Sequence, residues 1–238
     1  MDWPLAINRN REALQRIVAA LFMMAAAALT APGLSRRSLG EGGRGPVSLP
    51  RHIYAAILLI LRPAESAVRR LITIAAKDLA FKPRAPRLAP VGLPAFPVAG
   101  ASRTPAFALL DPLKQFTRDD FDVSAGSALS AAFASLFEPA FPTPSAYKSD
   151  EPVDAAQLYA RLRALRHALS DLPRQARRLA RWQARRDQAL AENRPTRITP
   201  FRPGLPPGWR QRSIHEIDEV LRECHGLALY AVNGPDTG

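Results

Sequence analysis

The stretch from Val153 to Asn193, VDAAQLYARLRALRHALSDLPRQARRLARWQARRDQALAEN, is expected to organise the rest of the chain. Its apolar residues recur alternately four and three positions apart, which places them on one face of a helix. This apolar stripe consists of Leu158, Leu162, Leu165, Leu169, Leu172, Ala176 and Leu179. Pro173 has no N–H, and its ring clashes with the carbonyl four residues earlier. We therefore predict a basic amphipathic helix over residues 153–193 that is kinked at Pro173, or a new helix capped by Ser170 or Asp171.

Arginines follow the same spacing on a neighbouring face of this helix. Such a helix either packs on a partner helix with its cations in water, or lies on an anionic surface. The alternative is that no ligand binds and the arginines form a solvated charged face, which contributes little to the stability of the protein. We predict that an anion or a partner binds Arg174, Arg177, Arg178, Arg181, Arg185 and Arg186.

Charge and cysteine content restrict the possible functions. The 238 residues include 33 Lys+Arg against 21 Asp+Glu, a net charge of +12 that attracts nucleic acid, anionic lipid or an acidic protein. Nearly all of the positive charge is arginine, which makes paired hydrogen bonds to phosphate. Cys224 is the one cysteine in the sequence. An intramolecular disulfide and the usual cysteine-based zinc site are therefore excluded.

Residues 1–81 are predicted to form an apolar helical hairpin. Its first apolar run, Ile17–Ala31, has 15 residues. As a helix it would be about 22 Å long, which is shorter than the ~30 Å hydrocarbon core of a membrane. Three interpretations of residues 17–34 stay open: a secretory signal peptide, a marginal membrane helix, and a buried alanine-rich helix.

The second helix of the hairpin, within residues 51–81, is also strongly periodic. Pro63 is expected to restart it, because proline suits the first turn of a helix. Its apolar stripe comprises Ile53, Ile57, Ile60, Ala64, Ala67, Leu71 and Ile74. A basic face is expected from Arg62, Arg69, Arg70 and Lys77.

Two proline-rich segments separate the predicted helices. Residues 82–152 contain ten prolines between Pro83 and Pro144, and they are expected to form a semi-extended linker with one short helix from Ser124 to Phe137. Residues 194–212 form a second linker, rich in proline and arginine. Apolar side chains expected to dock on the helices are Phe107, Leu109, Leu110, Leu113 and Phe116.

A final helix is predicted over residues 213–231. Ser213 and Glu216 have the spacing of a capping box. The predicted buried stripe is Ile214, Ile217, Leu221, Cys224 and Ala228.

The final helix also carries the one cluster of residue types that could bind a metal. His215, Asp218 and Glu219 share a side of the helix, whereas Cys224 and His225 point elsewhere. The alternative is a capped, ion-paired surface helix with a buried structural cysteine. The pattern is not the HExxH motif of zinc proteases. We therefore assign no catalytic residue, no metal ligand and no cofactor.

Three stretches of the chain, together about a fifth of its length, resemble a group of uncharacterised bacterial proteins. They are MDWPLAINRNREAL at the start, LPRQARRLARW over residues 172–182 and PPGWRQRSIHEIDEVLRECH over residues 206–225. The resemblance implies a bacterial origin and carries no activity.

The sequence thus predicts a mainly α protein. It has an N-terminal helical hairpin, a long basic amphipathic helix and a short C-terminal helix, joined by proline-rich irregular linkers. The predicted function is that of a non-enzymatic, membrane-associated binding or scaffold protein, which holds anionic lipid or a protein partner through its arginine-rich helix. It is expected at the cytoplasmic face of the bacterial cytoplasmic membrane, or in the cytoplasm. The alternatives are a soluble nucleic-acid-associated protein and a metal-dependent enzyme; no small-molecule substrate is identified.

Overall fold

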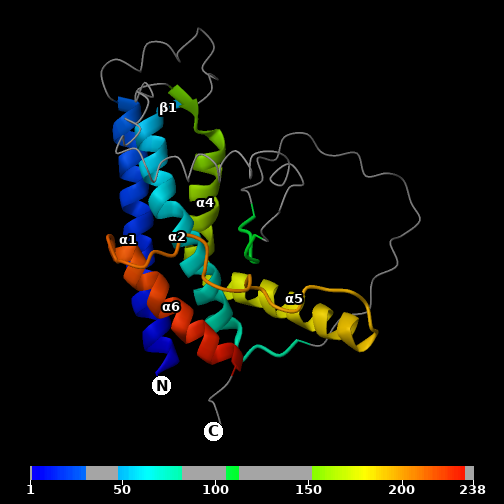
Figure 1. Ribbon diagram of the computed structural model, residues 1–238. Helices are drawn as coiled ribbons and strands as arrows, with labels where there is room; N and C mark the ends of the chain where they lie inside the picture. Colours follow the sequence, from blue (N-terminus) through cyan, green and yellow to red (C-terminus); the bar gives the residue numbers. More distant parts are fainter. Residues whose placement is uncertain (1, 31–47, 82–105, 113–151, 234–238) are drawn as a thin grey trace, which may run out of the picture.

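Helix α2 (Arg51–Ala76) lies at the centre of the structure (Figure 1). The computed structural model describes residues 2–30, 48–81, 106–112 and 152–233. Within these residues α2 packs against the four other helices, α1 (Trp3–Thr30), α4 (Ala156–Ser170), α5 (Leu172–Ala191) and α6 (Glu216–Asn233). The mainly helical fold class predicted from the sequence is confirmed, including the N-terminal helical pair and the C-terminal helix.

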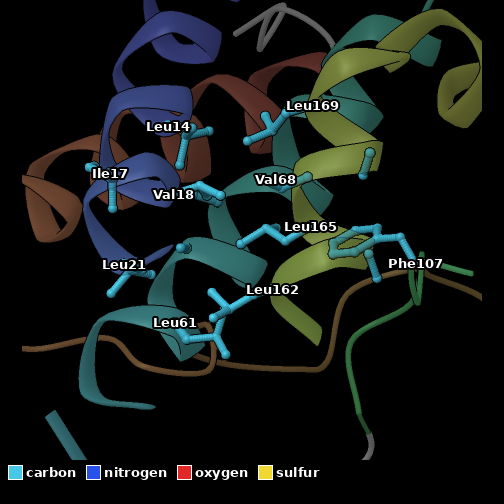
Figure 2. Close-up of a cluster of buried hydrophobic side chains, with 14 of the residues drawn as sticks. Leu14, Ile17, Val18, Leu21, Leu61, Val68, Phe107, Leu162, Leu165 and Leu169 are labelled. Carbon is cyan, nitrogen blue, oxygen red and sulfur yellow. The ribbon is translucent and has the colours of Figure 1, made fainter. Parts of the chain in front are cut away.

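The core fills the space between α1, α2 and α4. Each helix supplies apolar side chains at three- and four-residue spacing, so that one face of each is buried. Figure 2 shows that side chains from the three helices point toward one another, with Leu14, Val18 and Leu21 from α1, Leu61 and Val68 from α2, and Leu162, Leu165 and Leu169 from α4. From Pro63 to Ala76 α2 is buried on nearly every side, because α5 and α6 cover what α1 and α4 leave open.

Helix α1 uses its alanine-rich half as part of this core. Leu21, Ala25 and Ala28 are buried, and alanine allows a neighbouring helix to approach closely. The buried side of α1 agrees with the third interpretation, a buried alanine-rich helix, whereas Met23 on its other side is 71% exposed and residues 31–34 lie outside the described residues. No helix in the described ranges combines the length and hydrophobicity needed to span a bilayer.

The helix α2 runs through Pro63 without the restart that the sequence predicted. Because proline has no N–H, the carbonyl of Leu59 loses its helical hydrogen bond. Arg210 replaces that bond from outside, since its Nη2 donates to the Leu59 carbonyl at 2.8 Å. Beside it, Ser66 Oγ donates to the carbonyl of Pro207 at 2.7 Å. Residues 206–210 therefore fix the part of α2 that proline would otherwise weaken.

The break between α4 and α5 falls at Asp171. Its side chain accepts a hydrogen bond from the N–H of Arg174 at 3.2 Å, which caps α5 while Pro173 occupies the first turn. The structure therefore has the new helix capped by Asp171 rather than one helix kinked at Pro173, and α5 turns away from the direction of α4 (Figure 1). All seven residues of the predicted apolar stripe are buried.

Two short strands join the helices. The strand β1 (Ser48–Pro50) pairs with β2 (Pro152–Asp154) in antiparallel register, with Leu49 opposite Val153. Three-residue strands that contain proline give no alternating pattern, so the sequence did not indicate them.

Of the apolar residues expected to dock from the first linker, three are described. Phe107 is buried, and Leu109 and Leu110 pack against the core. The docking of these three is confirmed. Leu113, Phe116 and the predicted helix from Ser124 to Phe137 lie outside the described residues.

The last helix, α6, begins at Glu216 and not at Ser213. The capping box predicted between Ser213 and Glu216 is wrong. Asp218 takes this place, because its carboxylate accepts from the N–H of Ile214 at 3.0 Å and of His215 at 3.1 Å. Ile214 precedes the helix and is 71% exposed, so its predicted burial is also wrong. The rest of the stripe, from Ile217 to Ala228, is buried as predicted.

Candidate anion-binding surface

The six arginines predicted to bind a partner all lie on α5, but they divide into two groups. Arg178 and Arg186 are half-buried. The other four are exposed, and we call them the arginine row: Arg174, Arg177, Arg181 and Arg185. At 1.5 Å per residue, the row extends about 16 Å along α5.

The arginine row faces away from the core. With about 3.6 residues per turn, its four side chains fall within roughly a quarter of the helix circumference. The opposite side of α5 carries Leu172, Ala176 and Leu179, which are buried against the bundle. The apolar stripe thus fixes the orientation of the helix and directs the row to solvent.

The charge of the row is not neutralised within the described part of the chain. None of the ion pairs found there includes an arginine of the row. Arg181 lies with its guanidinium 5.4 Å from the ring centre of Phe81, and Arg185 Nε donates to the carbonyl of Arg181 at 3.2 Å. These contacts orient the two side chains and leave their charge unopposed.

The two half-buried arginines hold neighbouring segments of the chain. Arg178 Nη1 donates to Gln175 Oε1 at 2.5 Å and to the carbonyl of Phe107 at 3.4 Å. Arg186 Nη1 donates to the carbonyl of Ile198 at 2.7 Å, and its Nε and Nη2 donate to Asp187. Both guanidiniums therefore hold parts of the fold together, and the N–H groups that make these hydrogen bonds are not available to a partner.

A buried ion-pair network joins α2 to residues 106–112. Arg70 and the Asp111 side chain are both 0% exposed, and Arg70 Nη2 lies 2.9 Å from Asp111 Oδ2. Arg69 Nη1 lies 3.3 Å from Asp111 Oδ1 and its Nε donates to the carbonyl of Ala108. The sequence predicted that Arg69 and Arg70 belong to a basic face of the helix. The structure differs, because Asp111 neutralises both inside the core.

A second ion pair links α2 to α4. Arg161 makes two hydrogen bonds to the Glu65 carboxylate, at 2.8 and 2.9 Å. Arg69 lies on the other side of the same carboxylate, at 3.7 Å. A paired arrangement of this kind fixes the relative rotation of the two helices.

His225 receives a hydrogen bond from the same buried network. Arg70 Nε donates to His225 Nδ1 at 3.2 Å, and the ring of Trp209 packs edge-on against the imidazole. Burial lowers the pKa of His225, and the positive charge of Arg70 lowers it further, although Asp111 acts in the opposite direction. His225 is therefore kept neutral and serves as an acceptor.

The lowered pKa of His225 predicts that stability falls in mildly acidic solution. Below the ordinary histidine pKa of 6.5 the unfolded chain binds a proton that the folded chain refuses, so the free energy of unfolding rises with pH through this window and is fully recovered above it. His225→Asn keeps an acceptor for Arg70 and removes the titration. Urea unfolding between pH 5 and about pH 7.5 should show a slope in the parent chain that is lost in the variant; an unchanged slope would refute the assignment.

His215, Asp218 and Glu219, the one group considered as a possible metal site and assigned no metal, lie around the start of α6. Among the described residues, no three His, Cys, Asp or Glu side chains are placed to hold a metal ion. Burial opposes ionisation of Asp218, but its two backbone donors and Arg210, 3.1 Å away, together hold the pKa of Asp218 below its usual value. Burial raises the pKa of the Cys224 thiol to about 12. Asp218 and Cys224 thus have structural roles.

An apolar cavity of about 340 Å³ lies between α1, α2 and the start of α6. Its walls include Leu21, Met24 and Ile60. At its rim Arg16 pairs with Glu216 at 3.0 Å. Since this pair is neutral overall, the cavity offers no net charge to an anion and is separate from the arginine row.

Comparisons with known proteins do not identify the chain. No family model, no curated protein and no solved structure matches it.

Proposed function

We propose that this is a non-enzymatic binding protein that attaches to an anionic membrane surface through the arginine row of α5. The observation that supports the proposal is the row itself: four exposed arginines on one side of a helix, without a carboxylate partner among the described residues. Arginine pairs its N–H groups with the oxygens of lipid phosphates. Each cation near an anionic surface contributes about 1 kcal/mol to binding.

The attachment is expected to be superficial and electrostatic. The apolar stripe of α5 is packed in the core, so Leu172 and Leu179 are not free to enter the acyl-chain region. Binding then depends on headgroup charge, and salt should weaken it because exposed charges are screened over about 10 Å at 0.1 M ionic strength.

Sedimentation with lipid vesicles tests the proposal. The chain should sediment with vesicles of phosphatidylcholine mixed with phosphatidylglycerol, and stay in solution with phosphatidylcholine alone. Replacing the four row arginines by glutamine should weaken binding by roughly a thousandfold, at about 1 kcal/mol per cation. The matched control removes four exposed arginines away from the row, Arg9, Arg163, Arg194 and Arg212. Equal losses in the two variants would show that only net charge matters, and would overturn the proposal.

A second candidate function, binding to nucleic acid, is favoured by the same burial of the apolar stripe. A row that contacts its partner only through charge also suits the phosphates of a duplex. Gel-shift titrations across salt would reveal it: a contact made by four arginines should give a slope of log affinity against log salt of about −3 to −4. Retardation of a duplex that is lost in the row variant, together with no vesicle binding, would favour this candidate over the membrane.

A further inference from the structure

A small pocket lies at the amino-terminal end of the arginine row, where α4 ends and α5 begins. Its volume is about 190 Å³. His167 from α4 and Arg174, Gln175 and Arg178 from α5 line it, and Phe107 forms an apolar wall. Phe107 lies beside α4 in Figure 2. The pocket thus combines one arginine of the row with residues that the row does not include.

The polar side of the pocket carries positive charge from two arginines. His167 and Gln175 lie beside them, and no carboxylate lines the pocket. A neighbouring pocket of about 230 Å³, along the same side of α4, differs in that Glu65 lies there between Arg69 and Arg161. The α4–α5 pocket therefore has no ion pair of this kind among its lining residues.

Gln175 adds a polar group to the lining of the pocket. It is only 5% exposed, and its Oε1 accepts from Arg178 Nη1. In the described part of the chain its amide Nε2 donates no hydrogen bond. Since Nε2 is not one of the buried unpartnered atoms, solvent reaches it, and it is available to donate to an oxyanion that enters the pocket.

The helix ends around the pocket are already satisfied by other groups. Arg174 and Gln175 belong to the first turn of α5, whose positive dipole end is capped by the Asp171 carboxylate. The opposing dipole of α4 is offset, because Arg11 donates to the terminal carbonyls of Leu169 at 2.9 Å and Ser170 at 3.0 Å. The negative end of α4 is thus satisfied from outside the pocket.

We propose that this pocket binds a single phosphate group. Its volume is below the ~300–1,000 Å³ of pockets for drug-sized ligands, so it suits one tetrahedral oxyanion and not a whole nucleotide. Arginine supplies paired donors for such a group, and glutamine and histidine add further ones. The phosphate comes either from a lipid headgroup, in which case the inference rests on the proposed membrane function, or from phosphate free in solution.

Calorimetric titration of the full chain with inorganic phosphate, at constant ionic strength in chloride, tests the pocket. Three single variants separate it from the row: His167→Asn alters the pocket alone, Arg185→Gln alters the row alone, and Arg174→Gln alters both. His167→Asn and Arg174→Gln should each raise the Kd for phosphate about tenfold, whereas Arg185→Gln should change it less than about twofold. Absence of phosphate binding, or an equal effect of all three variants, would overturn the inference.

Vesicles identify the source of the phosphate. Phosphatidic acid ends in a phosphomonoester that can enter the pocket, whereas phosphatidylglycerol has a phosphodiester flanked by glycerol. With vesicles matched in surface potential, a loss of phosphatidic acid binding in His167→Asn assigns a lipid headgroup; a loss of inorganic phosphate binding alone assigns free phosphate. Vesicle binding that depends on the row and ignores His167, with no phosphate binding, would reject the pocket and leave the proposed function standing.

Discussion

Replacing Asp111 by alanine is expected to lower the free energy of unfolding by about 3–5 kcal/mol, because it leaves a buried charge without its partner. Arg70 is 0% exposed and lies 2.9 Å from the Asp111 carboxylate. Arg69, also nearly buried, depends on the same carboxylate. Urea unfolding followed by circular dichroism measures the loss. Asp78→Ala, which removes a carboxylate that is 84% exposed, is the control and should have little effect.

A double variant shows whether the loss comes from the unpaired charge. Arg70→Met fills the same space without a charge, so Asp111→Ala with Arg70→Met should be more stable than the sum of the two single losses by about 2 kcal/mol or more. If the single losses simply add, the ion pair is not the source of the stability. If Asp111→Ala does not fold, Arg70→Met still tests the same ion pair, because it removes the other partner.

The helices and their buried faces were predictable because their signals are local. The apolar stripe from Leu158 to Leu179 repeats with the helix period, and all seven residues are buried. Asp171 followed by proline is a common helix start, and Asp171 caps α5. The exposure of the arginine row follows from the same period, because side chains opposite a buried stripe point to solvent.

The parts that the sequence could not indicate depend on residues far apart in the chain. Residues 153–193 were expected to be the organising element, whereas the structure is centred on α2. Arg69 and Arg70 look like surface residues until Asp111, some 40 positions later, enters the core beside them; Arg70 and Asp111 are 41 residues apart. The roles of Arg178 and Arg186 likewise depend on the carbonyls of Phe107 and Ile198.

The second large effect is expected at Gly208, where alanine should lower the free energy of unfolding by roughly 2–5 kcal/mol. Its φ is +83°, a conformation that costs a residue with a side chain about 1–2 kcal/mol. A Cβ there would also lie 2.6 Å from the nitrogen of Pro63. Backbone atoms inside a packed helix cannot move aside, and overpacking of this kind costs a further ~1–3 kcal/mol.

Gly204 separates these two contributions. Its φ is +80°, but a Cβ at this position meets nothing within 4 Å. Gly204→Ala should therefore show the conformational cost alone, about 1–2 kcal/mol, and the difference from Gly208→Ala measures the contact with Pro63. If the two substitutions lower the free energy of unfolding by the same amount, the contact between position 208 and Pro63 does not contribute. If Gly208→Ala costs more than Gly204→Ala, the added Cβ pushes residues 206–210 away from Pro63. That displacement would also weaken the hydrogen bond from Arg210 to the Leu59 carbonyl, which is 2.8 Å long. The mid-helix proline of α2 is then tolerated because a segment some 150 residues later supplies the hydrogen bond that the helix lacks.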